Sequence, residues 1–227
     1  MCGIFGCEPA NEEWLKVSTV KQNSRGPDQS SEFVVGDIGL AVNRLAITGD
    51  LEQGAQPVFS KSKKSVCVFN GALYNYEDLI RDHYLSPESK NDAAVALELF
   101  ELKGIEFFNY IQGMFSIILV NLETKTMIVA RDNLGIKPLY WASNGGSILF
   151  SSSIRAIPTS MLPFVKPFPP GKIWLDNGHL KDIEPKIEKK GNIEKLLLET
   201  VKKHVPKEVE WGCSLSGGVD SSSICAM

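Results

Sequence analysis

The sequence predicts an α+β protein whose first two thirds form a strand-rich domain and whose end begins an α/β domain. Two observations favour the strand-rich part: short runs of β-branched and apolar residues recur, and glycine or asparagine turns separate them. The third observation concerns the C-terminus. A helical pattern, an apolar run and a glycine-rich loop follow one another there, which is how an α/β domain starts.

Strands are predicted where the short apolar runs end at turn residues. A helical pattern over Glu12–Val20 and a polar loop over Asn23–Gln29 come first. The runs with strand character are Phe33–Val35, Ile38–Thr48, Ser65–Phe69, Met114–Leu122, Lys125–Arg131, Leu139–Ala142 and Ile148–Ser151. By its composition Asn70-Gly71 is a turn that ends the third run, and a last small hairpin is expected around Asp176-Asn177-Gly178.

Two helices are predicted in the middle of the chain. Asn75 can cap the first, and Asp78 lies three residues later, in the position of a capping box. Asn91 or Asp92 caps the second helix, in which apolar residues recur at helical spacing until Gly104 ends it.

The composition predicts two domains joined by a linker. Residues 1–185 form the strand-rich domain, residues 186–192 are charged and turn-prone, and residues 193–227 begin the second domain. This last part holds a helix over Ile193–Val205 and a buried strand over Val209–Leu215 that leads into the glycine-rich loop. One strand does not make a parallel sheet, so we expect a fragment of a longer protein. The alternative is a remnant packed on the first domain.

The overall composition excludes intrinsic disorder, a collagen-like repeat and a coiled-coil rod. Hydrophobic residues make up 43% and charged residues 22% of the 227 residues, which is ordinary for a globular protein. The 24 basic and 27 acidic residues give a net charge of −3, so no bulk positive field attracts nucleic acid or a membrane surface. No membrane-length apolar run or secretory leader is visible, and we expect a cytoplasmic protein.

The five cysteines predict neither a disulfide framework nor a metal site. Their number is odd, they are scattered, and the chain shows no export signal. No Cys-x-x-Cys pair occurs and the three histidines lie far apart, so a zinc site has little support. We interpret Cys67, Cys213 and Cys225 as small buried hydrophobic residues.

Cys2 differs from the other cysteines because of its position. Its small side chain allows an aminopeptidase to remove Met1 and leave Cys2 at the N-terminus. An N-terminal cysteine carries its own base, an α-amino group with a reference pKa of about 8, beside its thiol. One residue then supplies both nucleophile and general base.

Several motifs, distant from one another in the sequence, indicate a role for Cys2. They are Met1-Cys2-Gly3-Ile4-Phe5-Gly6, Arg25-Gly26-Pro27-Asp28, Asn43-Arg44-Leu45-Ala46-Ile47, Asn70-Gly71-Ala72-Leu73-Tyr74-Asn75-Tyr76, Arg131-Asp132-Asn133-Leu134-Gly135-Ile136-Lys137-Pro138-Leu139-Tyr140, Ser151-Ser152-Ser153-Ile154-Arg155-Ala156 and Ser214-Leu215-Ser216-Gly217-Gly218-Val219-Asp220-Ser221-Ser222. In this order they resemble the glutamine-hydrolysing asparagine synthetases, in which a class II glutamine amidotransferase domain comes first. The resemblance runs over the whole chain.

The resemblance implies a fold and a reaction. The fold is the N-terminal-nucleophile hydrolase fold, a four-layer αββα sandwich, followed by the first helix and strand of an ATP-pyrophosphatase domain. Cys2 would attack the side-chain amide of glutamine and form a thioester, with its own amine shuttling the proton. Asn70 and Gly71 match the oxyanion hole, in which a side-chain amide and a backbone N–H meet the developing charge.

Other positions match the glutamine-binding residues of the family. Arg44, which alone would be interpreted as a surface arginine, matches the residue that binds the α-carboxylate. Asp92 matches the residue that holds the α-ammonium group. Ala72 departs from the family, which usually has glutamate there, so one carboxylate near the ammonium group is missing. The backbone that would line the same pocket belongs to Leu45, Ala46, Ile47 and Thr48.

The C-terminal motif resembles the pyrophosphate loop of enzymes that cleave ATP to AMP and pyrophosphate. It follows an apolar run and opens a helix, as phosphate-binding loops do. Asp220 could also help to hold magnesium. ATP and Mg²⁺ are implied for the complete synthetase reaction and not for glutamine hydrolysis. The positions that match ATP-binding residues are Ser214, Ser216, Gly217, Gly218, Asp220 and Ser221.

Other enzymes with related domains match these motifs less completely. Amidotransferases that act on phosphoribosyl pyrophosphate or fructose 6-phosphate lack Ser216–Ser222, and β-lactam-forming relatives lack the nucleophile Cys2. The acceptor of the ammonia stays open between aspartate and another carboxylate. A truncated, non-catalytic glutamine-binding paralogue is the alternative from another class. The expected partners are glutamine, ATP and the acceptor, with a homodimer left open.

Overall fold

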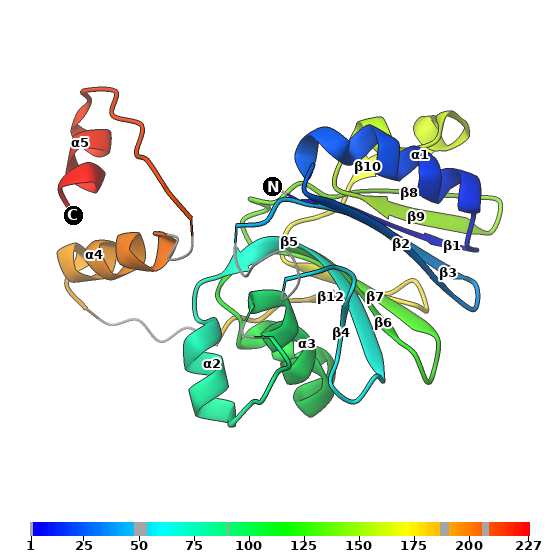
Figure 1. Cartoon of the computed structure of the whole chain (residues 1–227), viewed down its shortest axis with the longest axis horizontal. Helices are drawn as coiled ribbons and strands as arrows, with labels where there is room; N and C mark the ends of the chain where they lie inside the picture. Colours follow the sequence, from blue (N-terminus) through cyan, green and yellow to red (C-terminus); the bar gives the residue numbers. More distant parts are fainter. Residues whose placement is uncertain (1, 48–53, 90, 187–190, 206–208) are drawn as a thin grey trace.

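Two stacked antiparallel sheets form the centre of the molecule (Figure 1). The computed structural model describes residues 2–47, 54–89, 91–186, 191–205 and 209–227. Helices lie on the outer face of each sheet, which gives four layers in the order helix, sheet, sheet, helix. The αββα sandwich predicted for the first domain is therefore confirmed.

The first sheet has β1 at its centre. In the described residues its strand order is β10-β8-β9-β1-β3-β2. The bounds are β1 (Gly3–Glu8), β2 (Gln29–Val35), β3 (Ile38–Arg44), β8 (Tyr140–Asn144), β9 (Ser147–Ser151) and β10 (Lys166–Pro167). β1 pairs with β3 on one edge and with β9 on the other. Because both edges are paired, the N-terminal strand is fixed, and Cys2 lies immediately before its first residue.

The second sheet has β5 and β6 as its longest pair. Its order in the described residues is β12-β11-β7-β6-β5-β4. The bounds are β4 (Val58–Phe59), β5 (Ser65–Leu73), β6 (Gly113–Asn121), β7 (Thr126–Arg131), β11 (Lys172–Leu175) and β12 (Leu180–Asp182). The prediction that Asn70-Gly71 is a turn is wrong, because both residues lie inside β5 and pair with Ser116 and Phe115 of β6. The long partner strand overrides the turn preference of the dipeptide.

The helices begin and end close to where the sequence predicts them. α1 (Glu12–Gln22) covers the first sheet, while α2 (Tyr76–His83) and α3 (Asp92–Lys103) lie on the second (Figure 1). Asn91 caps α3, since its Oδ1 accepts the Ala94 N–H at 2.8 Å. The capping box predicted for α2 does not form: the Asn75 side chain bonds instead to the backbone of Tyr110 and Gln112. Short 3-10 helices are η1 (Asn23–Arg25), η2 (Gly104–Asn109), η3 (Ile154–Ala156) and η4 (Thr159–Phe164).

Apolar side chains fill the spaces between the layers. Val68 belongs to the cluster between the two sheets, and its neighbour Phe69 belongs to the cluster beneath α3. Adjacent residues face opposite layers because side chains alternate along a strand. Phe5 and Leu15 belong to a third cluster, between the first sheet and α1. The core thus fixes β5, which contains Asn70 and Gly71, and β1, which Cys2 immediately precedes.

The C-terminal residues are arranged differently. α4 (Ile193–His204) and α5 (Val219–Ala226) lie to one side of the sandwich (Figure 1) and contain no buried residue in the part of the chain described. The predicted strand Val209–Leu215 is wrong: no strand in the described ranges pairs with it, and it is an irregular segment. Cys213 and Cys225 are exposed, which corrects their interpretation as buried residues, whereas Cys67 is buried as expected.

The predicted linker follows the last strand of the sandwich. Ile183 still belongs to the core beneath α3, and the Lys186 N–H donates to the Asn109 carbonyl at 2.8 Å. Residues 187–190 of the linker lie outside the described residues, so the domain boundaries stay a prediction. Among the residues described, every helix is too short or too polar to cross a membrane.

Candidate active site

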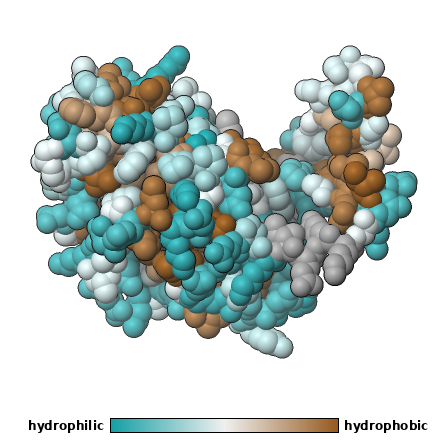
Figure 2. All heavy atoms as spheres, turned by 180° about the vertical axis from the view of Figure 1, so that it is seen from behind, coloured by the Kyte–Doolittle hydropathy of each residue, from teal (hydrophilic) through white to brown (hydrophobic). Residues whose placement is uncertain are grey.

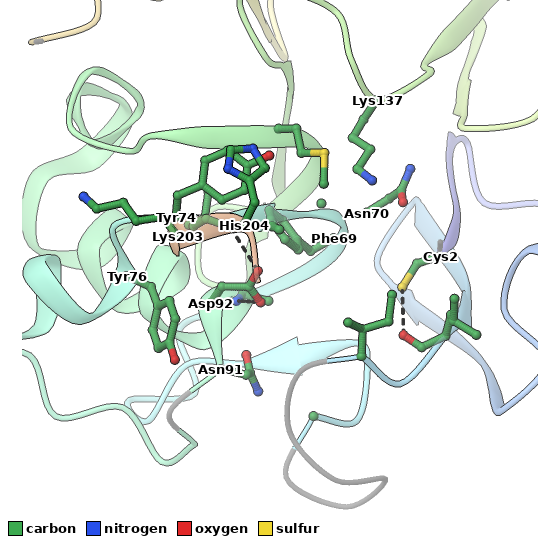
Figure 3. A pocket seen from close by; sticks show the side chains of 18 of the residues that line it. Cys2, Phe69, Asn70, Tyr74, Tyr76, Asn91, Asp92, Lys137, Lys203 and His204 are labelled. Carbon is green, nitrogen blue, oxygen red and sulfur yellow. Dashed lines mark hydrogen bonds between the residues drawn. The ribbon is translucent and has the colours of Figure 1, made fainter. Parts of the chain in front are cut away.

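A cavity of about 480 Å³ lies beside the start of β1 and the end of β5. Its volume falls in the range typical of small-molecule sites, about 300–1,000 Å³. Segments far apart in the sequence line it, and Figure 3 shows their side chains converging. The residues predicted from the sequence that line it are Cys2, Arg44, Leu45, Ile47, Asn70, Gly71, Ala72 and Asp92.

The thiol of Cys2 faces this cavity from the start of β1. Its Sγ lies 3.9 Å from the Leu45 carbonyl oxygen, to which it donates (Figure 3). Burial raises the pKa of this thiol, while the hydrogen bond to Leu45 and the charge of Arg44 act in the opposite direction. A thiol with a raised pKa is protonated at neutral pH, so a nucleophilic Cys2 needs a base or a nearby positive charge.

The motif Arg25-Gly26-Pro27-Asp28 holds the neighbourhood of Cys2 together. The Arg25 Nε donates to the Cys2 carbonyl at 3.2 Å. Asp28 is bonded to the end of β3 and to the segment after it: its N–H donates to the Arg44 carbonyl at 3.1 Å and its Oδ2 accepts the Ala46 N–H at 2.8 Å. Ala46 therefore faces Asp28, and it is not among the residues that line the cavity.

Arg44 ends β3 and lines the cavity. Only 3% of it is exposed, so the interpretation as a surface arginine is wrong. Gly26 makes room beside it, because a Cβ at this position would lie 2.2 Å from the Asn43 carbonyl oxygen. Thr48, which was predicted to continue this wall of the pocket, lies outside the described residues.

The backbone of β5 leaves one N–H directed at the cavity. The N–H and the carbonyl of Phe115 both bond to Asp132, so they point away from the opposite residue, Gly71. In an antiparallel ladder, Gly71 must then direct its own N–H away from β6. The residues two before and two after it share this direction.

Those two neighbouring N–H groups are both occupied. The Phe69 N–H donates to Gln56 Oε1 at 2.7 Å, and the Leu73 N–H donates to Asp92 Oδ2 at 3.1 Å. Between them, Gly71 lines the cavity and no side chain in the described residues accepts from its N–H. This N–H group is thus a donor available to a ligand. A Cβ at Gly71 would lie 2.4 Å from the Met114 carbonyl oxygen, so only glycine fits there.

The Asn70 side chain lies next to this donor, on the side of the cavity where Cys2 is found (Figure 3). It is 1% exposed. Its Nδ2 makes one long hydrogen bond, 3.4 Å to Ser116 Oγ, and its Oδ1 has no partner in the described residues. A buried amide that is so weakly bonded retains the capacity to bind a ligand.

Carboxylates and cations also surround the cavity. Asp92, at the first turn of α3, accepts the Leu73 and Ala93 N–H groups and is buried. Glu77 and Asp78 of α2 line the wall as well. Asp92 also lines the cavity, so its carboxyl group can contact an ammonium ion there. The positively charged lining residues from outside the predicted set are Lys137, Lys202 and Lys203.

Helix α4 of the C-terminal segment reaches the same cavity. The rings of His204 and Tyr74 lie 3.9 Å apart, and Lys203 Nζ lies 3.6 Å from Asp78 Oδ2. The local sequence pattern gives no signal for these contacts or for Lys137 in the cavity. It also gives none for the hydrogen bonds between the Gln56 side chain and the Phe69 backbone. Lys137 lies inside a long family motif, which is the one signal that could have indicated it.

The glycine-rich loop at the end of the chain is not part of this cavity. Its contacts are local: Ser216 Oγ lies 2.9 Å from Ser221 Oγ, and Ser221 Oγ donates to the Gly218 carbonyl at 3.1 Å. Gly217 has a φ of +81°, a backbone conformation that glycine adopts readily. α5 begins after Gly218, so free backbone N–H groups point out of the loop, as a phosphate would require. Ser214 and Asp220 are exposed.

The residues fit a magnesium ion only in part. Asp220 is one carboxylate near the loop, and no group of three or more metal-binding side chains occurs in the described residues. Mg²⁺ is commonly held by one or two carboxylates together with substrate phosphates. The loop is therefore compatible with magnesium carried by a nucleotide.

The fold is shared with solved amidotransferase structures. The glutamine phosphoribosylpyrophosphate amidotransferase from B. subtilis superimposes with a TM-score of 0.67 at 18% identity, covering 80% of this chain and 49% of that chain. A structure of the allosteric regulatory enzyme of purine biosynthesis gives a TM-score of 0.66 with the same coverage. The chain therefore shares the four-layer fold of these two enzymes.

The sequence identifies the family more closely. Residues 1–166 match the glutamine amidotransferase domain and residues 192–227 match the asparagine synthase family. The chain belongs to the glutamine amidotransferase domain family. Asparagine synthetase B (glutamine-hydrolysing) of Escherichia coli is 31% identical, and the asparagine synthetase (glutamine-hydrolysing) of Zea mays is 33% identical, each aligned with 100% of this chain. The chain spans 44% and 42% of the length of these two relatives.

Proposed function

We propose that the chain hydrolyses glutamine to glutamate and ammonia at this cavity. The observation that carries the proposal is the free Gly71 N–H between two occupied N–H groups of β5, beside the weakly bonded Asn70 amide. Both groups lie in the cavity that Cys2 faces. Acyl transfer from an amide requires a nucleophile, here the thiol, and hydrogen-bond donors that bind the oxyanion, here two N–H groups.

In the proposed reaction Cys2 is both nucleophile and base. Removal of Met1 frees the α-amine, which takes the thiol proton, and the thiolate forms a C–S bond with the amide carbon. The amide oxygen becomes an oxyanion bound by Asn70 and Gly71. The C–N bond then breaks, the amine returns its proton to the leaving nitrogen, and water later hydrolyses the thioester to glutamate.

Charged side chains bind the α-carboxylate and α-ammonium groups at the other end of glutamine. Arg44 binds the α-carboxylate through its guanidinium group, which is shaped to make two parallel hydrogen bonds. Asp92 holds the α-ammonium group. Ala72 lines the cavity without a charge, and Glu77 and Asp78 supply negative charge from α2.

We also propose that the ammonia serves an ATP-dependent amidation. Two relatives are named glutamine-hydrolysing asparagine synthetases, and the C-terminal loop resembles a pyrophosphate loop. The loop from Ser216 to Ser221 would bind the pyrophosphate part of ATP, with Asp220 near the magnesium ion. Aspartate is the acceptor that the resemblance favours, and another carboxylate is the alternative. Since the chain spans less than half of these relatives, the amidation belongs to the whole protein, whose location we expect to be cytoplasmic.

The first test is a glutaminase assay on this chain and a Cys2→Ala variant. Release of glutamate and ammonia should fall by about a thousandfold or more, because the nucleophile is lost. Cys213→Ala is the matched control, because Cys213 is an exposed cysteine outside the cavity, and it should keep full activity. Hydrolysis by Cys2→Ala at the parental rate would refute the proposal.

The second test adds ATP, magnesium and aspartate. The described C-terminal residues hold the glycine-rich loop only by local contacts, so we expect glutamate and ammonia without pyrophosphate. Aspartate-dependent release of pyrophosphate would contradict this expectation and show that the loop is competent in this chain.

A further inference from the structure

Lys137 is a buried cation in the same cavity as Cys2. Only 5% of it is exposed, it lines the cavity, and Figure 3 shows its side chain pointing inward on the side where Asn70 and Cys2 lie. Within the described ranges, no hydrogen bond or ion pair holds its ammonium group. Partial loss of hydration costs a charged group free energy, so a lysine at this position calls for an explanation.

The backbone around Lys137 is fixed on both sides of the residue. The Lys137 N–H donates to Asp132 Oδ2 at 3.0 Å, and the Lys137 carbonyl accepts from Arg131 Nε at 2.7 Å. Asp132 and Arg131 also bind other backbone groups of this region, belonging to Phe115, Leu134, Gly135, Ile136 and Phe168. These bonds fix the backbone from which the Lys137 side chain extends into the cavity.

Several charged groups influence this ammonium group. Burial lowers the pKa of Lys137, and the positive charge of Arg25 acts in the same direction. The negative charges of Cys2, Asp132 and Asp92 raise it. Attraction between two charges is mutual, so a thiolate at Cys2 is stabilised by the Lys137 ammonium group as much as it stabilises that group.

We propose that Lys137 is a positioning residue for glutamine hydrolysis, whose fixed positive charge stabilises the Cys2 thiolate and the negative charge that forms at the Asn70–Gly71 end of the cavity. The inference rests on the proposed function. Lys137 exchanges no proton in the reaction: the thiol proton goes to the α-amine and then to the leaving ammonia. Burial raises the pKa of Cys2, and a positive charge at Lys137 would act against that effect.

A purely structural role predicts a different outcome on substitution. If the lysine served packing or stability, its loss would lower the melting temperature. If the lysine instead serves catalysis through its charge, Lys137→Met should leave the melting temperature unchanged or raise it. Methionine has a similar length and no charge. Lys137→Gln is a second neutral variant, and Lys137→Arg keeps the charge.

The test measures the rate of Cys2 alkylation by iodoacetamide across a pH series, read from the N-terminal peptide by mass spectrometry. In Lys137→Met and Lys137→Gln the apparent pKa of the thiol should rise by about one unit, and kcat should fall by about tenfold with KM changed less. Lys137→Arg should restore most of both. Above the pKa of Lys137 the ammonium group loses its charge, so the alkylation curves of parent and Lys137→Met should converge there.

The control is Lys203→Met, which removes a cavity-lining cation that is ion-paired with Asp78; it should leave the apparent pKa of Cys2 unchanged. An unchanged alkylation profile in both neutral Lys137 variants would overturn the inference. The alkylation arm needs no turnover. A parent chain that hydrolyses no glutamine therefore refutes the proposed function, while the alkylation profiles still decide the role of Lys137.

Discussion

Asn70-Gly71 and Ser216-Gly217-Gly218 are both glycine motifs, and the structure holds them in different ways. Asn70-Gly71 lies inside β5, paired with β6, with buried residues on both faces. The hydrogen bonds within the second motif join residues at most five positions apart, and α5 after it has no buried residue in the described part of the chain.

The apolar residues show the same contrast. The described buried core ends at Ile183. Beyond it, Trp211 is 59% exposed and Leu215 is 63% exposed, and Figure 2 shows apolar side chains on the surface of the C-terminal segment. The first motif is thus held by tertiary structure and the second by local geometry. A site held by tertiary structure can act by itself, whereas a local loop needs further contacts to bind a nucleotide firmly.

Hydrogen exchange should show the largest difference between the two regions. Amides of β5 and β6 are paired in the core and open only when the sandwich unfolds, so their exchange should be slower than that of residues 209–227 by about a thousandfold or more. Mass spectrometry of peptides after timed deuterium labelling measures it. Equal protection of the two regions would mean that the C-terminal segment is packed in solution.

Glycine-to-alanine substitutions in the two motifs should change the stability of the protein by different amounts. Gly71→Ala forces a Cβ to within 2.4 Å of the Met114 carbonyl oxygen, and should lower the free energy of unfolding by about 3 kcal/mol. Gly217 has open space around it, so Gly217→Ala meets only the cost of its positive φ, about 1 kcal/mol, and that cost is local.

Thermal unfolding of both variants checks the pair. We expect a clearly lower melting temperature for Gly71→Ala and an unchanged one for Gly217→Ala. A similar loss in both variants would show that the C-terminal loop unfolds together with the sandwich.

Ala72→Glu tests how the cavity beside Asn70-Gly71 binds the α-ammonium group of glutamine. A carboxylate added to the cavity wall attracts the α-ammonium group of glutamine, and a charge-assisted contact of about 1.5–3 kcal/mol corresponds to roughly tenfold or more in affinity. The three carboxylates already there, from Glu77, Asp78 and Asp92, reduce the gain. KM for glutamine in steady-state assays is the readout, and equal values for parent and variant would mean that the existing carboxylates suffice.

Lys203→Met should have the smallest effect, at the junction of the two regions. Lys203 and Asp78 form a partly exposed ion pair at 3.6 Å, and such pairs contribute about 0–1 kcal/mol. We expect less than a twofold change in KM for glutamine, measured at low and high salt. A tenfold change would show that α4 is an essential wall of the substrate cavity.

Most of the secondary structure could be predicted because it follows local patterns. The hairpin of β6 and β7 and the capping of α3 by Asn91 are encoded within a few residues. Two of the wrong predictions about strands failed for one reason: a strand depends on its partner. β6 extends β5 through Asn70 and Gly71, and no described strand pairs with Val209–Leu215.

The candidate site was predictable only in part. The convergence of Cys2, Arg44 and Asp92 came from the family resemblance, since no local pattern brings together residues so far apart. The burial of Lys137 depends on how Arg131 and Asp132 fold the preceding loop. Such tertiary arrangements are invisible to hydrophobic periodicity, which reports only which face of an element is buried.

The most direct test of the central claim is the mass of the chain during turnover. Rapid acid quenching of the chain with glutamine, followed by intact mass and peptide analysis, should reveal chains that start at Cys2 and carry one glutamyl group on that thiol. Chains that retain Met1 should carry none, because their α-amine is not that of Cys2. A glutamyl group on any other residue, or full turnover by chains that retain Met1, would contradict the account.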